Sequence, residues 1–225
     1  MVRPMIHWAR ENRGFLLFLL LLGVFRTAVA DWNPIPSGSM RPTLLEGDLV
    51  LVNRLAYDLK LPLTDIALAH LGDPARGDIV TFHSPRDGTR LIKRIAAVPG
   101  DVVEMRDKRL YVNGTAADYG PPQVVAEPAE GGLQRAAARM TETVAGRAHV
   151  VQWLAPTDHD DFGPMRIPAD RFLMLGDNRD NSADSRYFGL VPRELLIGRA
   201  IRVLGSLDAP GNWMPRLRRF GAALD

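Results

Sequence analysis

A continuous apolar run near the start is the first strong pattern along this chain. Residues 14–25 contain only glycine, phenylalanine, leucine and valine, and the apolar span reaches Ala30 if Arg26 extends its charge toward water. A helix of about 17 residues is roughly 25 Å long, which is the short limit for crossing a bilayer. Arginines in residues 1–13 orient the N-terminus toward the cytoplasm and place the rest of the chain outside it. The pattern therefore predicts one transmembrane helix over residues 14–30.

The same segment also has the features of a cleavable secretory signal. It combines a basic start, an apolar core of about 11 residues and an A-x-A cleavage site at Ala28-Val29-Ala30. On the segment alone, a retained anchor and a removed signal peptide are equally good interpretations.

From residue 47 onward the pattern changes to short alternating runs that are rich in valine and isoleucine. Gly-Asp pairs punctuate these runs, and the combination predicts strands separated by turns. Residues 101–113 predict a hairpin. Strands are also expected over residues 171–175 and 195–204, on either side of a polar loop at residues 176–186. The chain is therefore predicted to be mainly β.

Proline and glycine residues that interrupt this pattern indicate the domain organisation. Residues 115–165 contain Pro-Pro and Gly-Gly pairs and an alanine-rich patch, and we expect them to form an inserted β-rich subdomain with irregular parts. This subdomain interrupts a β domain made of residues 31–114 and 166–210. The tail, residues 211–225, mixes aromatic residues with arginine, a mixture that fits either contact with anionic lipid or a frayed end.

Composition excludes several classes of function. The 225 residues are 46% hydrophobic and 24% charged, an ordinary globular balance, and a net charge of +2 does not favour a nucleic-acid partner. The absence of cysteine removes disulfides, thiolate nucleophiles and cysteine-ligated metals. His149 and His159 lie near acidic residues without a tight ligand spacing, so a solvated acidic loop is favoured over a metal site. We expect neither a metal nor a cofactor.

A candidate nucleophile lies in the Pro/Ser-rich stretch at residues 34–45. Prolines bracket a Ser-Gly-Ser sequence there, so a stiff loop can present the hydroxyl of Ser39 in a fixed place. A serine hydroxyl needs a base to remove its proton. Neither the Gly-x-Ser-x-Gly nor the Ser-x-x-Lys arrangement is present around Ser39, so the base must come from elsewhere in the chain.

Lysine is the candidate base because the chain has 25 arginines and only three lysines, and arginine does not deprotonate in proteins. Strand alternation places Lys93 on one apolar face with Leu91, Ile95 and Ala97, while Arg94 points the other way. Burial disfavours the ammonium form and lowers the pKa of such a lysine. A fall from roughly 10.4 to about 8 costs about 3 kcal/mol, which a buried site can impose. Coding bias and a snorkelling lysine are the alternative explanations.

These stretches belong to a longer pattern. It consists, in order, of the Ser39 loop, residues 77–82, residues 93–101 and residues 176–186. Together they closely resemble the conserved boxes of bacterial type I signal peptidases. The resemblance is dense over residues 31–113 and 171–200 and thin elsewhere.

The resemblance implies a Ser/Lys dyad. Ser39 attacks the scissile carbonyl, and neutral Lys93 takes the hydroxyl proton and later returns it to the leaving amine. The backbone N–H of Ser39 and the hydroxyl of Ser37 are implied to stabilise the oxyanion. No histidine is required.

The resemblance also assigns supporting roles within residues 176–186. Ser182 places a hydroxyl near the lysine amine, and Asp184 and Arg186 form an ion pair. Asp177, Asn178 and Arg179 match the same box and are interpreted as residues that hold its turn. An EF-hand interpretation of this acidic loop fails, because neither the central glycine nor the closing glutamate is in place.

The implied protein is a membrane-anchored endopeptidase with a signal-peptidase-like antiparallel β-sheet. It is expected to act on exported preproteins at the outer face of the cytoplasmic membrane and to cut after small residues. The resemblance favours a retained helix over a cleaved signal. Its expected partners are preprotein signal peptides and membrane lipid, without nucleic acid, and the chain is expected to be a monomer.

Three alternatives stand beside this interpretation. A peptidase dedicated to a plasmid-transfer pilin is a narrower version of the same activity. A self-cleaving SOS repressor shares the dyad but needs an N-terminal DNA-binding helix pair that this sequence lacks. A noncatalytic, membrane-anchored β module belongs to a different class and leaves a preprotein uncut.

Overall fold

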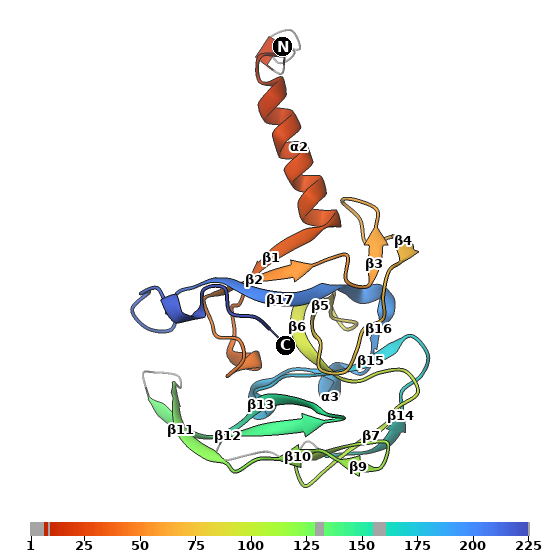
Figure 1. Ribbon diagram of the computed structural model, residues 1–225, viewed down its shortest axis with the longest axis vertical. Helices are drawn as coiled ribbons and strands as arrows, with labels where there is room; N and C mark the ends of the chain where they lie inside the picture. Colours follow the sequence, from red (N-terminus) through yellow and green to blue (C-terminus); the bar gives the residue numbers. More distant parts are fainter. Residues whose placement is uncertain (1–6, 9, 129–132, 155–160, 225) are drawn as a thin grey trace.

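A computed structural model describes residues 7–8, 10–128, 133–154 and 161–224. Its N-terminal helix, α2 (Arg13–Ala28), stands away from a body of β-sheets (Figure 1). Leucine-rich sequence favours a helix because side chains that are not branched at Cβ lose little rotamer freedom there. No helix among the described residues is both long enough and apolar enough to span a bilayer.

The largest sheet carries the strands that flank the candidate site. Seven strands pair antiparallel in the order β1-β2-β17-β5-β6-β15-β16. Their bounds are β1 Ala30–Pro34, β2 Asp48–Asn53, β17 Leu196–Ser206, β5 Ile79–His83, β6 Arg90–Ala97, β15 Arg171–Leu175 and β16 Val191–Pro192. The strand predicted over 171–175 is confirmed as β15, and the one predicted over 195–204 as β17. The polar loop 176–186 therefore leaves the end of a strand that neighbours β6.

A second sheet contains the predicted hairpin. Strands β7 (Val102–Arg106) and β8 (Arg109–Val112) pair antiparallel, which confirms the expectation for residues 101–113. Asp107 and Lys108 form the turn with φ of 47° and 64°, a left-handed geometry that suits a two-residue hairpin loop. Strands β14 (Phe162–Arg166) and β9 (Thr115–Ala116) complete the order β14-β7-β8-β9.

A third sheet is made from residues of the expected insertion. Its strands are β10 Asp118–Tyr119, β11 Gln123–Pro128, β12 Gln134–Val144 and β13 Arg147–Leu154, with β12 paired to all three others. A separate hairpin of β3 (Asp58–Lys60) and β4 (Ala67–His70) lies beside the base of α2 (Figure 1). Within the described residues, the stretch from 118 to 154 is therefore largely regular β structure.

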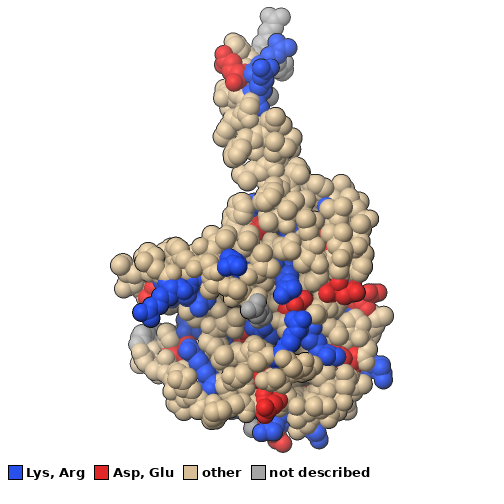
Figure 2. All heavy atoms as spheres, viewed as in Figure 1, with Lys and Arg blue, Asp and Glu red and all other residues tan. Residues whose placement is uncertain are grey.

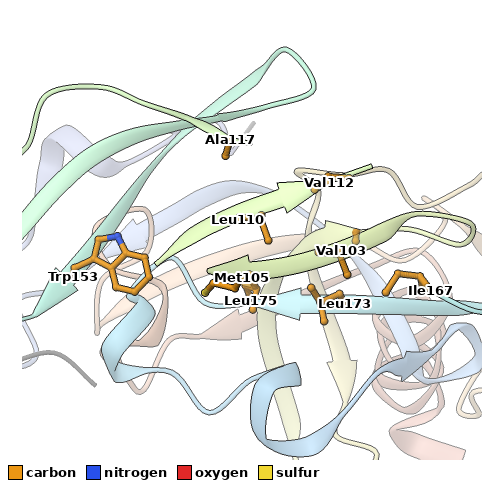
Figure 3. Packing of buried hydrophobic residues seen from close by; sticks show 10 residues of the cluster. Val103, Met105, Leu110, Val112, Ala117, Trp153, Ile167, Leu173 and Leu175 are labelled. Atoms are coloured by element: carbon orange, nitrogen blue, oxygen red, sulfur yellow. The ribbon is translucent and has the colours of Figure 1, made fainter. Parts of the chain in front are cut away.

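The second sheet is fixed to β15 by a hydrophobic core. Val103 and Met105 of β7 and Leu110 of β8 face Leu173 and Leu175 of β15, and all five are at most 1% exposed (Figure 3). Burying a side chain of this size contributes about 1.5–3 kcal/mol. This packing fixes β15 on one side, at the point where the polar loop begins.

The C-terminal tail is docked on the β body. Arg219 pairs with buried Asp48 at 2.5 Å, and Arg216 donates to the Leu207 carbonyl at 2.8 Å. The described part of the tail is therefore held in place, so a frayed end is not what the structure shows. Trp213 and Leu217 remain exposed on it.

Candidate active site

The Ser39 loop is held by its neighbours in sequence. A single 3₁₀ turn, η1 (Gly38–Met40), carries Ser39, and the side chains of Met40 and Leu44 are 1% and 0% exposed in the core beneath it. Ile35 donates its N–H to the Asp48 carbonyl at 2.8 Å, which attaches the start of the loop to β2. Ser39 itself is half-buried and Ser37 is exposed. Apolar anchors on both sides thus keep the hydroxyl-bearing turn in one position.

Lys93 reaches this turn from the middle of β6. Its Nζ lies 2.5 Å from the Oγ of Ser39, although the two residues are 54 positions apart in sequence. The side chain is only 3% exposed, and Ile95 and Ala97, predicted to share its face, are buried as well. The structure therefore brings together the nucleophile and base predicted from the sequence.

Burial sets the protonation of Lys93. Removal from water lowers the pKa of its ammonium group from 10.5 to about 8. The nearby Asp184 and Asp177 carboxylates act in the opposite direction and raise this pKa, whereas the Arg186 guanidinium lowers it further. A lysine with this pKa is about half neutral near pH 8. The neutral amine can accept a proton from the hydroxyl 2.5 Å away.

The polar loop 176–186 packs directly against the Ser39 turn. A Cβ on Gly176 would lie 2.2 Å from the Ser182 Oγ and 2.6 Å from the Ser39 carbonyl oxygen, so only glycine fits at position 176. Asn178 donates its backbone N–H to the Ser39 carbonyl at 3.1 Å and its side-chain amide to the Gly38 carbonyl at 2.9 Å. Asn178 thus binds the two carbonyls at the nucleophile and does more than hold a turn.

Asp184 and Arg186 form the ion pair expected of them. Arg186 donates from Nε and Nη2 to the two carboxylate oxygens of Asp184, both at 2.8 Å. Fully buried Asp184 also accepts the Gly176 N–H at 2.9 Å, which ties the pair to the backbone beside Ser39. Ser182 is 7% exposed and its Oγ makes no hydrogen bond to any other described residue, so its expected role beside the Lys93 amine stays a prediction.

Arg94 is buried, which the strand alternation did not indicate. It is 3% exposed and donates to both carboxylate oxygens of Asp177, at 2.9 and 2.8 Å. Asp177 also accepts the Thr43 hydroxyl at 2.5 Å. The residue next to the lysine is therefore connected, through one carboxylate, to the loop that carries the nucleophile.

Two histidines, His149 and His159, lie near acidic residues in the sequence. His149 lies 3.3 Å from a carboxylate oxygen of Glu142, and that carboxylate is held by Arg179 at 2.5 and 2.8 Å. His159 lies outside the described residues. Across the part of the chain that is described, no group of three or more potential ligands is arranged to hold a metal ion.

The third sheet also reaches the nucleophile loop. Arg41, two residues after Ser39, pairs with Glu46 at 2.8 Å and with Glu127 of β11. Glu127 is 3% exposed and also pairs with Arg139, which donates to Gln152 at 2.9 Å. Residues of the expected insertion thus brace the loop that presents Ser39.

Replacing Glu127 with glutamine tests this brace. Glu127→Gln leaves the buried Arg41 guanidinium short of one carboxylate, and we expect kcat to fall roughly 10- to 100-fold because a displacement of about 1 Å at a reacting group can cost 10² in rate. Adding Arg41→Met removes the poorly compensated charge and should restore most of the rate. Exposed Glu194, changed to glutamine, is the matched control. Unchanged kcat in Glu127→Gln contradicts the brace.

Comparison with known proteins identifies the family. The family model "Signal peptidase, peptidase S26" matches residues 6–204. The chain belongs to this signal peptidase family. A signal peptidase I of Pseudomonas fluorescens is 36% identical over 93% of this chain and 77% of its own length, and one of Pseudomonas aeruginosa is 35% identical over the same shares. A crystal structure of a signal peptidase I from Enterococcus faecalis aligns with a TM-score of 0.36 and 30% identity over 57% of this chain and 97% of that one.

In this signal peptidase, the sequence pointed to the residues that meet at the site but not to those that brace it. Ser39 and Lys93 carry a chemical signal, a hydroxyl in a stiff loop and a rare lysine on an apolar strand face. Asn178 and Glu127 carry no comparable signal, because an asparagine in a turn and a glutamate in a strand are common. The proline that follows Arg41 indicates a stiff loop. Nothing in the sequence indicates that the distant Glu127 carboxylate pairs with Arg41.

Proposed function

We propose that this chain is a membrane-anchored serine endopeptidase that removes signal peptides from exported preproteins, with Ser39 as nucleophile and Lys93 as base. The observation that carries the proposal is the 2.5 Å approach of a buried, pKa-lowered lysine amine to the hydroxyl of a serine in a braced loop. Membership of the signal peptidase family supports the substrate class.

The geometry supports a two-step reaction. Neutral Lys93 takes the proton of the Ser39 hydroxyl as Oγ bonds to the scissile carbonyl carbon, forming a tetrahedral intermediate. The resulting ammonium group returns the proton to the leaving amine, and the carbon–nitrogen bond breaks to leave an acyl-enzyme on Ser39. Lys93, neutral again, then takes a proton from water as the water oxygen attacks the ester carbonyl. It returns that proton to the Ser39 oxygen as the ester bond breaks, which releases the signal peptide and restores the Ser39 hydroxyl.

Oxyanion stabilisation is assigned to the backbone N–H of Ser39 and the hydroxyl of Ser37. Ser37 is exposed and extended (φ −138°, ψ 157°), and its side chain makes no capping hydrogen bond to the turn that follows. An exposed hydroxyl without a capping partner is available to a substrate oxyanion.

The change Ser37→Ala tests this assignment. We expect kcat to fall by roughly 10²- to 10³-fold, the usual cost of one oxyanion donor. The thermal midpoint should stay close to that of the wild type, because the exposed hydroxyl caps nothing. A rate equal to that of the wild type leaves Ser37 as a turn residue and contradicts its role as a donor.

Cleavage after small residues follows from the proposed substrate class. Purified full-length protein should cut a preprotein with alanine at the first and third positions before the cleavage site. It should leave intact a matched preprotein with a bulky aromatic residue at the first of these positions. Equal cutting of both contradicts this specificity, and failure to cut either one contradicts the function.

The apolar surface of α2 supports the membrane anchor. Side chains on all sides of the helix are exposed, including Phe15, Phe18 and Leu21 at 57–58%, and Figure 2 shows its shaft without charged side chains. A helix that is apolar all round needs an apolar surrounding. At its end, Arg26 pairs with Asp31 at 2.8 Å and lies 4.4 Å from the ring centre of Trp32, a grouping suited to a membrane–water interface. The β body is assigned to the extracytoplasmic side.

Retention of the anchor has a direct test. N-terminal sequencing of protein extracted from membranes should find residues 14–30 still attached, because the helix holds the enzyme beside its substrates. A mature chain that begins at Asp31 shows that Ala28-Val29-Ala30 is a processed site and contradicts the anchor.

A further inference from the structure

A polar cleft lies between the nucleophile loop and the third sheet. Its volume is about 560 Å³, and ligand pockets in proteins are usually roughly 300–1,000 Å³. Its walls include Arg41 and Glu46, which follow Ser39 in the chain, Glu127 and Gln152 of the third sheet, and Asn178 of the polar loop. Because the walls carry amides and charges of both signs, the cleft suits a polar ligand.

Two amide side chains lie next to each other in the wall of this cleft. Gln152 of β13 and Asn178 form an isolated parallel β-bridge, in which the Gln152 N–H donates to the Asp177 carbonyl at 2.8 Å. Residues that are paired across a bridge project their side chains to the same face. Both side chains line the cleft, and the two residues are only 0% and 2% exposed.

Each of these two amides has one polar atom without a partner. The Oε1 of Gln152 accepts from Arg139 at 2.9 Å, and the Nδ2 of Asn178 donates to the Gly38 carbonyl at 2.9 Å, so both amide orientations are fixed. The remaining Gln152 Nε2 and Asn178 Oδ1 make no hydrogen bond to any described residue. A buried polar atom without a partner destabilises the fold. The pair therefore fits a ligand that brings one acceptor and one donor.

A residue of an extended polypeptide has this combination of groups. Its own N–H and C=O point to the same side of the chain, which is how one residue makes two hydrogen bonds with a neighbouring strand. The carbonyl can accept from Gln152 Nε2 while the N–H donates to Asn178 Oδ1. The cleft thus offers a binding site for the main chain of a peptide.

The position of the cleft decides which part of a substrate enters it. Asn178 also donates its backbone N–H to the Ser39 carbonyl at 3.1 Å, so the two amides lie close to the nucleophile. The third sheet is at the end of the body away from α2 (Figure 1). The segment of a preprotein before the cut carries the apolar part of the signal and comes from the membrane. The polar cleft on the opposite side therefore matches the segment after the cut.

We propose that this cleft binds the first residues after the scissile bond, which become the N-terminus of the mature protein. One of these residues is bonded through its carbonyl to Gln152 Nε2 and through its N–H to Asn178 Oδ1. This inference rests on the proposed function and names the place where the leaving segment is held. Holding that segment keeps the leaving amine in reach of the Lys93 ammonium group, which must protonate it.

Two peptide substrates and two variants of Gln152 test the assignment. Both peptides have the same signal segment, but the long one has a polar segment of several residues after the cut and the short one has a single blocked residue. Gln152→Glu keeps an acceptor for Arg139 and loses the donor, whereas Gln152→Met loses both at similar size. Gln123→Met, at an exposed position of β11, is the matched control. The measurement is kcat/KM of the purified full-length protein.

We expect each Gln152 variant to lose about 3- to 10-fold in kcat/KM on the long peptide, the range for one hydrogen bond, and to match the wild type on the short peptide. Gln123→Met should match the wild type on both. Equal losses on the two peptides assign Gln152 a structural role and overturn the proposal. Unchanged rates of the Gln152 variants on both peptides also overturn it.

A second measurement needs no variant of the protein. In a series of long peptides, one backbone amide after the scissile bond is replaced by an ester, which removes the N–H that Asn178 Oδ1 accepts. One member of the series should lose a similar 3- to 10-fold with the wild-type protein, and uniform rates overturn the proposal. Equal wild-type kcat/KM for the long and short peptides overturns the cleft assignment alone. Failure to cut either peptide contradicts the proposed function itself.

Discussion

Changing Lys93 to arginine is expected to abolish preprotein cleavage, with a loss on the order of 10³-fold or more. Arginine keeps the positive charge and much of the length of the side chain, but its guanidinium does not lose a proton in proteins. The Ser39 hydroxyl, 2.5 Å from Nζ in the wild type, then has no acceptor for its proton. Initial rates on a purified preprotein measure the loss.

The same substitution at a second lysine is the matched control. Lys108 is partly exposed in the β7–β8 turn, where its Nζ lies 5.4 Å from the ring centre of Trp153, and Lys108→Arg should retain wild-type activity. General-base catalysis typically contributes about 10²- to 10⁴-fold in rate. A Lys93→Arg variant that keeps more than about a tenth of the wild-type rate therefore contradicts the role of Lys93 as the base.

Ser39→Ala is expected to remove activity to a similar extent while leaving the fold intact. The substitution deletes the atom that bonds to the scissile carbonyl, and the two halves of a nucleophile–base pair act as a unit, so losing either costs nearly the whole effect. Met40 and Leu44 hold the turn from below, and Ser39 contributes little to that packing. Cleavage rate and thermal midpoint, measured on the same preparation, separate loss of chemistry from loss of structure.

The combination with Lys93→Arg sharpens this prediction. If Ser39 and Lys93 act together, the double variant should be no slower than either single variant, within error. Multiplying losses in the double variant indicate independent roles. Appreciable turnover by the single variant Ser39→Ala shows that another residue is the nucleophile.

Local patterns predicted much of the β fold. The hairpin over residues 101–113 and the strand over 171–175 could be predicted because alternation and turn chemistry are local properties. Lys93 was placed on an apolar face by the same alternation. Predictions of this kind need no knowledge of what packs on the strand.

The burial of the opposite face of β6 could not be predicted from alternation. Alternation places Arg94 on the face opposite the apolar one, and in a half-buried strand that face is exposed to solvent. In the structure, however, Arg94 is buried against Asp177, which is 83 positions away. Glu127 and Arg41 are 86 positions apart, and their pairing depends on how the third sheet folds back over the nucleophile loop. Long-range ion pairs of this kind leave no period in the sequence, so alternation cannot find them.

The central claim is that neutral Lys93 is the base for Ser39, and the pH dependence of kcat/KM tests it most directly. Below its pKa the buried lysine is an ammonium that cannot accept a proton, so the rate must rise with pH as that proton leaves. With a peptide substrate that has no group titrating in this range, the account predicts kcat/KM rising through an apparent pKa of about 8 to a plateau. A profile that is flat, or that rises only near the 10.5 of an ordinary lysine, contradicts the account.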